Sequence, residues 1–326
     1  MIPLPGARVG LVVGDVVGHG IAASATMGRL RTAVRTLADI DLPPDELLTH
    51  LDDIVTHAEA ERSDTSDEIP GDVGATCLYA VYDPVSGVCS LARAGHPAPV
   101  LVRPDGTSNV VALPAGPPLG LGSLPFEAAE VTVPEGSLLA LYTNGLLAAG
   151  DVDERTDVLR RHLASPASSL DALCDTVLRT LSPTPGIDDS TLLLARPRLF
   201  GEDRVASWDV PVDPAAVAEG RRHASVRLTA WGLEDAAFVT ELVVSELVTN
   251  AIRHAVALIR LRLIRNETLV CEVSDGSSTS PHLRRARLSD EGGRGLFMVA
   301  ELTQRWGTRY TRAGKTIWAE QLLPTR

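Results

Sequence analysis

An aperiodic segment divides this chain of 326 residues into two parts that differ in pattern and in charge. Residues 197–207 (PRLFGEDRVAS) show neither the helical nor the strand repeat of apolar residues. Residues 1–205 hold 14 basic and 28 acidic residues, whereas the remainder holds 16 basic and 14 acidic residues. A chain of this length is expected to form about two domains. We therefore predict domains over residues 1–197 and 208–326, joined by a linker over residues 198–207.

The composition argues against several functional classes. A net charge of −12 is unfavourable for a general nucleic-acid binder. No run approaches the roughly 18–20 apolar residues of a membrane helix, and the N-terminus MIPLPGARVG lacks the pattern of a signal peptide. Cys77, Cys89, Cys174 and Cys271 show no CxxC spacing, which is typical of buried thiols in a reducing compartment. We expect a cytoplasmic protein with neither a membrane nor a nucleic-acid partner.

The first part predicts strands and helices in separate blocks. A β-branched strand over residues 8–17 is broken by a Gly-His-Gly turn, and helical spacing follows over residues 21–38 and 44–60. Five short runs then alternate with turn residues, which is typical of a mostly antiparallel sheet system. They are ATCLYAVYDP, GVCSLARAG, APVLVRPDG, FEAAEVTVPEG and SLLALYTNG. A helix over residues 168–181 and a strand over residues 190–197 complete this part.

The second part predicts a sheet with helices grouped on one face. It begins with a strand (SWDVPV) and two helices, from Pro214 to about Ala230 and from Asp235 to about Ala255. Two strands, LIRLRLI and TLVCEVSD, come next, followed by a polar loop, a helix after Gly295 and two final strands. This order predicts an α/β sandwich.

Three short motifs of polar residues and glycines in the second part indicate a nucleotide site. Glu246, Asn250 and His254 recur every four residues and so share one face of a helix. An acidic and an amide side chain one turn apart can hold a hydrated Mg²⁺ ion, although a solvated polar stripe explains this helix equally well. Asp275 and Gly276 end a strand, where the carboxylate could accept a hydrogen bond from a base amine and the glycine admits a ring. Taken alone, Asp-Gly after a strand usually forms a turn.

The third motif is a glycine-rich segment directly before a predicted helix. Gly292, Gly293 and Gly295 precede an amphipathic run, and backbone N–H groups at such a helix start suit phosphate oxygens. Arg294 adds a positive charge, while the alternative is a flexible connection. The tripeptide that begins at Gly314 reads Gly-Lys-Thr but is not a P-loop, because Arg309 stands where the first glycine would be.

In order and spacing, these three motifs resemble those of the GHKL ATP-binding fold, specifically its anti-sigma-factor serine kinase branch. The resemblance implies that Glu246 is a general base and that Asn250 binds Mg²⁺ between the phosphates of ATP. It also implies that Asp275 and Gly276 lie at the adenine. The phosphates would lie beside Gly293, Arg294 and Gly295.

Three polar strand ends in the first part indicate a metal site. Asp15 ends a buried strand, where its carboxylate and the Val16 carbonyl could ligate divalent metals. Asn144 follows another strand, and Asp188 and Asp189 precede a third. Converging strand ends of this kind can build a two-metal site for phosphoester hydrolysis, whereas each acidic residue alone is explained by a surface turn.

Together GDVVGHG, ATCLYAVYDP, ARAGHPAPVLV, PAGPPLGLG, LLALYTNGL and DDSTLLLAR resemble the SpoIIE-like branch of the PPM metal-dependent serine/threonine phosphatases. The resemblance implies an α+β chain: a PPM-type αββα sandwich whose N-terminal strands are missing, followed by a GHKL α/β sandwich. It implies that Asp15 bridges two Mn²⁺ or Mg²⁺ ions and that Asp188 binds the second. Two departures stand out: Asn144 occupies a usual Asp position, and the family's upstream acidic strand precedes the point where this sequence starts. A misassigned start, a true truncation and a partial sequence are the three explanations.

Two functional hypotheses follow. The first is a partner-switching regulator that dephosphorylates a serine-phosphorylated anti-anti-sigma-type protein and binds ATP in a kinase-like domain. The second is a pseudophosphatase with an ATP-binding module, which sequesters a sigma factor or its antagonist without catalysis. Asn144 cannot neutralise metal charge, so we expect weakened metal occupancy. Exposed sheet edges also suggest a homodimer.

Overall fold

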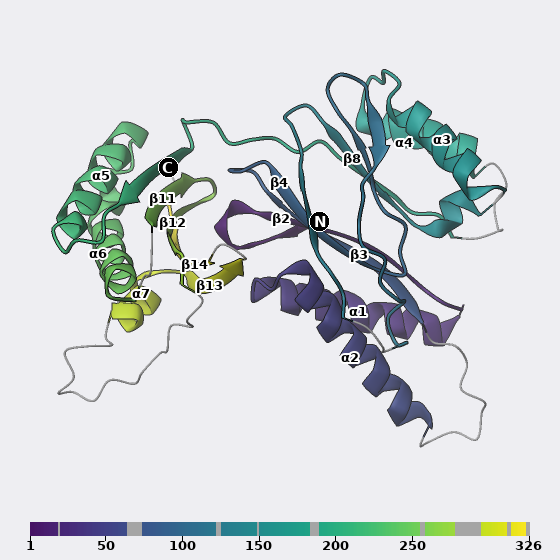
Figure 1. Ribbon diagram of the computed structural model, residues 1–326, viewed down its shortest axis with the longest axis horizontal. Coiled ribbons are helices and arrows are strands. Elements are labelled where there is room, and N and C mark those ends of the chain that lie inside the picture. The colour runs from purple at the N-terminus through teal and green to yellow at the C-terminus, as the bar shows by residue number, and fades with distance from the viewer. Residues whose placement is uncertain are drawn as a thin grey trace. The chain divides into compact units, whose positions relative to one another are not determined.

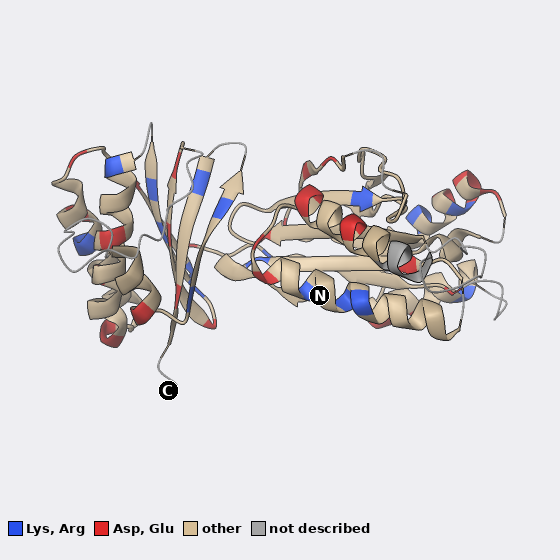
Figure 2. Cartoon of the chain, turned by 90° about the horizontal axis from the view of Figure 1, so that it is seen from below, with Lys and Arg blue, Asp and Glu red and all other residues tan. Residues whose placement is uncertain are grey.

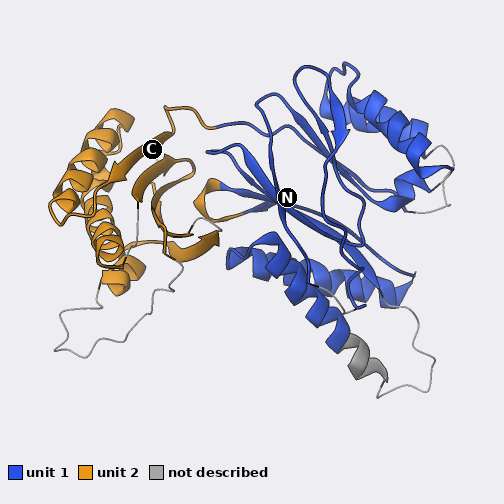
Figure 3. Cartoon of the chain, in the orientation of Figure 1, with its two compact units in different colours: residues 1–3, 8–199 blue, residues 4–7, 200–326 orange. Residues whose placement is uncertain are grey.

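The computed structural model describes residues 1–18, 20–63, 74–121, 125–148, 150–182, 189–254, 258–277, 295–311 and 314–323 (Figure 1). It divides the chain into two compact units (Figure 3). Unit 1 comprises Met1–Pro3 and Arg8–Leu199, and unit 2 comprises Leu4–Ala7 and Phe200–Arg326.

Unit 1 contains two antiparallel sheets. The first has the strand order β1 (Ile2–Pro3), β2 (Val9–Val16), β3 (Ala75–Asp83), β4 (Val88–Ala94), β7 (Ala129–Thr132). The second has the order β6 (Ser108–Val110), β5 (Val100–Val102), β8 (Leu138–Tyr142), β9 (Leu192–Ala195). Apolar side chains of both sheets, among them Leu11, Leu78, Leu101 and Leu139, form one shared core.

Helices cover the outer faces of both sheets (Figure 1). The helices α1 (Ile21–Asp39) and α2 (Pro44–Ser63) pack on β2, β3 and β4. On the other sheet, α3 (Val152–Leu163) and α4 (Leu170–Leu181) bury leucine and valine side chains against β5 and β8. Unit 1 is therefore the αββα sandwich that the sequence resemblance implied.

Helix α3 is the main element that the sequence reading missed. Six of its twelve residues are charged, and only Leu159 and Leu163 are buried, so its apolar repeat is weak. Its start is stabilised locally, because the Asp151 side chain accepts hydrogen bonds from the backbone N–H groups of Asp153 and Glu154. Arginines in its last turn complement the helix dipole.

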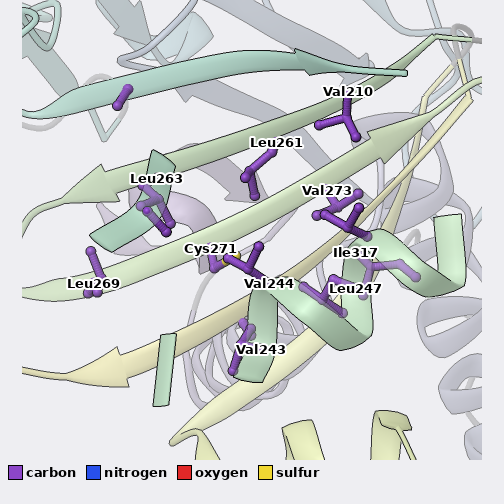
Figure 4. Packing of buried hydrophobic residues seen from close by; sticks show 14 of the residues in the cluster. Val210, Val243, Val244, Leu247, Leu261, Leu263, Leu269, Cys271, Val273 and Ile317 are labelled. Atoms are coloured by element: carbon purple, nitrogen blue, oxygen red, sulfur yellow. The ribbon is translucent and has the colours of Figure 1, made fainter. Parts of the chain in front are cut away.

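Unit 2 is an antiparallel five-stranded sheet with helices on one face. The strand order is β10 (Val205–Val210), β11 (Ile259–Arg265), β12 (Thr268–Asp275), β14 (Gly314–Leu322), β13 (Arg305–Thr311). The helices are α5 (Ala216–Trp231), α6 (Ala237–His254) and α7 (Gly295–Leu302). Figure 4 shows Val243, Val244 and Leu247 of α6 packed against apolar side chains of β11, β12 and β14. This arrangement is the predicted α/β sandwich.

The strands of the two units differ in charge (Figure 2). Among the described strands, those of unit 1 carry one basic residue, Arg93, whereas those of unit 2 carry six. Two of the six, Arg262 and Arg309, pair with the buried carboxylate of Glu272 at 3.4 and 3.2 Å. The sheet of unit 2 thus contains buried ion pairs as well as an apolar core.

The cysteines are free thiols, and burial raises the pKa of Cys77 and of Cys89 to about 12. These two side chains therefore act as small apolar groups. None of the helices in the described part of the chain has the length and apolar character needed to cross a membrane.

Candidate functional site

Helix α6 carries the first of the three predicted motifs of unit 2. Its buried stripe of valine and leucine side chains faces the sheet, and this orientation leaves Glu246 and Asn250 half-buried at the edge of that stripe. The two side chains lie one turn apart on the same face. His254, one further turn along, is exposed at the end of the helix.

The start of helix α7 lies directly against Glu246. A Cβ atom on Gly295 would collide with the Oε2 atom of Glu246, so a larger residue there would require the Glu246 side chain to move. The structure thus brings together two predicted residues that are 49 positions apart in the chain. Gly292, Gly293 and Arg294 lie outside the described residues.

Asp275 is the last residue of β12, and its side chain is only 1% exposed. Its Oδ1 atom accepts a hydrogen bond of 2.8 Å from the backbone N–H of Ser277, and its Oδ2 atom lies 3.7 Å from Nζ of Lys315. Gly276, the next residue, is exposed. A fixed carboxylate beside an exposed glycine is suited to hold the polar edge of a ring.

In unit 1, Asp15 lies near the end of β2, directly across from Thr76 of β3. The side chain is half-buried, and one carboxylate oxygen accepts a hydrogen bond of 2.9 Å from the Val16 N–H. The Asp15 carboxylate and the Val16 carbonyl are oxygen ligands of the kind that Mg²⁺ and Mn²⁺ prefer. The local donor set therefore fits a hard divalent cation.

Asn144 begins a short 3₁₀ helix directly after β8 and is exposed. Its neighbour Thr143 ties this strand end to the segment before β9. The Thr143 N–H donates to the Thr191 carbonyl at 3.1 Å, and the Thr191 N–H donates to the Thr143 hydroxyl at 2.9 Å. Asn144 therefore lies next to the segment that includes the exposed Asp189.

The predicted ligand Asp188 lies outside the described residues. Within the part of the chain that the structure describes, no three His, Cys, Asp or Glu side chains cluster closely enough to hold a metal ion. The oxygen donors that can be placed are those of Asp15, Val16 and Asn144. Of the predicted ligands in unit 1, the described residues thus include one carboxylate, that of Asp15, and Asp189, the neighbour of Asp188, is a further described carboxylate.

His96 is a further buried polar residue of unit 1, and none of the sequence motifs above singles it out. It is 1% exposed, and its Nδ1 atom lies 2.9 Å from the hydroxyl of Thr76, the cross-strand partner of Asp15. Burial lowers the pKa of His96 to about 4, and the main chain of Tyr142, which approaches the ring, opposes this shift. The buried imidazole of His96 is therefore neutral at neutral pH.

The chain matches two family models. Residues 5–198 match the family described as Stage II sporulation protein E (SpoIIE), and residues 210–320 match the histidine kinase-like ATPase domain. Both matches agree with the two resemblances that the motifs suggested, in the same order along the chain.

Two known proteins give more specific similarities. Phosphoserine phosphatase RsbP of Bacillus subtilis (strain 168) is 25% identical over 164 residues, which are 50% of this chain and 39% of RsbP. The crystal structure of the RsbU and RsbW domains of Rv1364c from Mycobacterium tuberculosis is 26% identical, with a TM-score of 0.53. That similarity covers 100% of this chain and 88% of the solved chain.

The low pKa of His96 predicts a pH dependence of stability. The unfolded chain takes up this proton below its ordinary pKa of 6.5, while the folded chain resists uptake until about pH 4. The free energy of unfolding should therefore fall by about 3 kcal/mol as the pH decreases from 6.5 to 4. Urea denaturation followed by circular dichroism measures this, and His96→Asn should flatten the dependence. His50→Asn, at an exposed position on α2, is the control and should keep the pH dependence of wild type. The same pH dependence in both variants would contradict its assignment to His96.

The contact at Gly295 predicts that Gly295→Ala displaces the Glu246 carboxylate from its position at the start of α7. We expect the affinity for Mg-ATP to fall about tenfold or more, because a small displacement of a binding group is costly. Calorimetric titration measures the affinity. Gly28→Ala is the control, since a Cβ there meets no described atom within 4 Å. An affinity unchanged in Gly295→Ala would show that the two elements do not act together.

Proposed function

This chain belongs to the SpoIIE family, and on that premise we propose that it is a partner-switching regulator. In this proposal residues 1–197 form a metal-dependent phosphoserine/phosphothreonine protein phosphatase. Residues 208–326 form an ATP-binding, serine-kinase-like domain. The supporting observation is the similarity of the entire chain to a solved pair of RsbU and RsbW domains. The positions of Asp15, Glu246 and Asp275 agree with it.

In the phosphatase domain, Asp15 would bridge two Mn²⁺ or Mg²⁺ ions. The Val16 carbonyl, the Asn144 amide oxygen and the Asp188 carboxylate would complete the protein ligands. The ions, when bound, would activate water and neutralise the charge of the phosphate. Asn144 contributes an oxygen but no charge, so the site holds its cations less tightly than one with an aspartate there. His96, neutral and buried, would fix the strand ends without adding positive charge.

In the second domain, Asn250 would hold the Mg²⁺ of bound ATP, and Asp275 with Gly276 would contact the adenine. Gly293, Arg294 and Gly295 would lie at the phosphates, where the backbone N–H groups at the start of α7 favour negative charge. Glu246, placed against Gly295, would accept the proton of the attacking hydroxyl. Phosphoryl transfer in this domain would oppose hydrolysis in the other.

The substrate shared by both reactions would be an anti-anti-sigma-type protein that is phosphorylated on serine. One observation favours a second candidate: Asn144 is exposed and uncharged at a position where the family pattern has an acidic ligand. The alternative is therefore a pseudophosphatase that binds ATP and sequesters a sigma factor or its antagonist.

We predict that hydrolysis of a generic phosphoester by this chain depends on Mn²⁺ and is lost in Asp15→Ala. Asn144→Asp restores one negative charge at the metals, so at limiting Mn²⁺ it should raise the rate about tenfold. Asn109→Asp is the control, because Asn109 is an exposed residue of the same unit on β6. Activity that survives Asp15→Ala would contradict the site, and no activity in wild type or Asn144→Asp would favour the pseudophosphatase.

We further predict that Asn250→Ala weakens the binding of Mg-ATP about tenfold or more, because the metal loses its protein ligand. The affinity for ATP in the presence of EDTA should change little, since only the metal contact is removed. Titration with and without Mg²⁺ separates the two effects. Asn266→Ala, at an exposed turn of the same unit, should behave as wild type. Equal Mg-ATP affinities in Asn250→Ala and wild type would refute the assignment of this helix face.

A further inference from the structure

Lys315 is the only lysine in the chain, whose other 29 cationic side chains are arginines. It is the second residue of β14 and lies directly opposite Asp275 in the register of β12 and β14. Its Nζ atom is 3.7 Å from Oδ2 of Asp275, and the two side chains are 3% and 1% exposed. A buried amine thus faces the buried carboxylate at the proposed adenine position.

The backbone around this pair is built to hold it. A Cβ atom on Gly314, whose φ angle is +139°, would collide with the carbonyl oxygen of Asp275 and would lie 2.8 Å from the Cα atom of Gly276. The start of β14 therefore packs directly against the backbone of Asp275 and Gly276. On the next pair of residues, the hydroxyl groups of Ser274 and Thr316 are 2.8 Å apart and share a hydrogen bond. These contacts fix the register that places Lys315 at Asp275.

Both oxygens of the Asp275 carboxylate are held. The Ser277 N–H donates to Oδ1 at 2.8 Å, and Lys315 faces Oδ2. A carboxylate oxygen has more than one lone pair, so it can still accept a hydrogen bond from a ligand while it keeps these partners. The carboxylate is therefore oriented before any ligand arrives.

A buried ion pair is a poor source of stability, because two apolar side chains of similar volume often serve as well or better. Removing one partner, however, leaves an uncompensated buried charge, which is strongly unfavourable. A carboxylate that accepts a hydrogen bond from a base amine at this buried position therefore needs a compensating cation beside it. Lys315 meets that requirement as a compact point charge.

We propose that Lys315 is a positioning residue for base recognition. Its amine compensates the buried Asp275 carboxylate and orients it toward the exocyclic amine of adenine, so the preference for an amino-purine nucleotide depends on it. This inference rests on the proposed ATP site. It assigns a role to the Gly-Lys-Thr tripeptide that is unrelated to a P-loop.

The test compares two nucleotides that differ only at the amine: ATP and purine riboside triphosphate, which carries hydrogen at that position. Affinities of the full chain are measured by calorimetry in Mg²⁺. Wild type should prefer ATP about tenfold or more, because a site built for a hydrogen bond rejects a ligand that lacks it. Lys315→Met should lose about tenfold in ATP affinity and change less than about twofold for the analogue.

Two further variants sharpen the test. Lys315→Gln keeps a polar donor in the buried position, so it should fold where the methionine variant does not, and it should lose part of the ATP preference. Asp275→Asn should also lose the preference, and adding Lys315→Met to it should cause no further loss, because the two residues act through one contact. Circular dichroism checks the fold of each variant.

Equal weakening of both nucleotides in the lysine variants would reveal a purely structural pair and would overturn this inference alone. An unchanged ATP preference in folded Lys315→Met or Lys315→Gln would do the same. Folded wild type that binds neither nucleotide would overturn the proposed ATP site, and with it this inference.

Discussion

The apolar packing of the sheets determines where polar chemistry is possible in this chain. In unit 1, leucine and valine side chains from both sheets fill the space between them, and helices cover the outer faces. A carboxylate inside such a layer would be buried without partners, at a large cost. Polar side chains that must approach a ligand are therefore confined to strand ends, where Asp15 and Asn144 lie. The position of the candidate metal site therefore follows from the same constraint as the sandwich.

Unit 2 obeys this constraint and adds a second one, which is close contact between backbones. Asp275 again ends a strand, but Glu246 lies inside a helix, and the start of α7 comes so close to it that a Cβ atom at residue 295 would displace its carboxylate. Gly314 similarly lets β14 approach Asp275. At these two positions the absence of a side chain on glycine allows the backbone to approach a functional residue closely.

Much of the fold could be predicted because its apolar repeats are strong. Apolar residues at helical spacing predict α6 and its neighbouring helices. Runs of β-branched residues predict the strands β2, β3 and β12. Helix α3 could not be predicted in this way, since charged residues interrupt its repeat and its start depends on the Asp151 cap. For the candidate sites, the local pattern predicted that Asp15 and Asp275 lie at strand ends, and the structure places them there. The local pattern did not identify His96 and Lys315, because their partners Thr76 and Asp275 lie 20 and 40 residues away.

The charges of the two sites lead to different dependences on ions. In unit 1 the proposed donor at position 144 is neutral and His96 is neutral at neutral pH, so neither would offset the charge of the two divalent cations proposed there. Occupancy there should follow the free metal concentration closely, because fewer protein charges attract the cations. In unit 2 the buried Asp275 is already balanced by Lys315, and the phosphates of ATP themselves provide the negative charge that Mg²⁺ requires. Under the proposed function, the nucleotide site should therefore keep its Mg²⁺ at a lower free metal concentration than the first site, so metal supply would shift the balance between the two proposed activities.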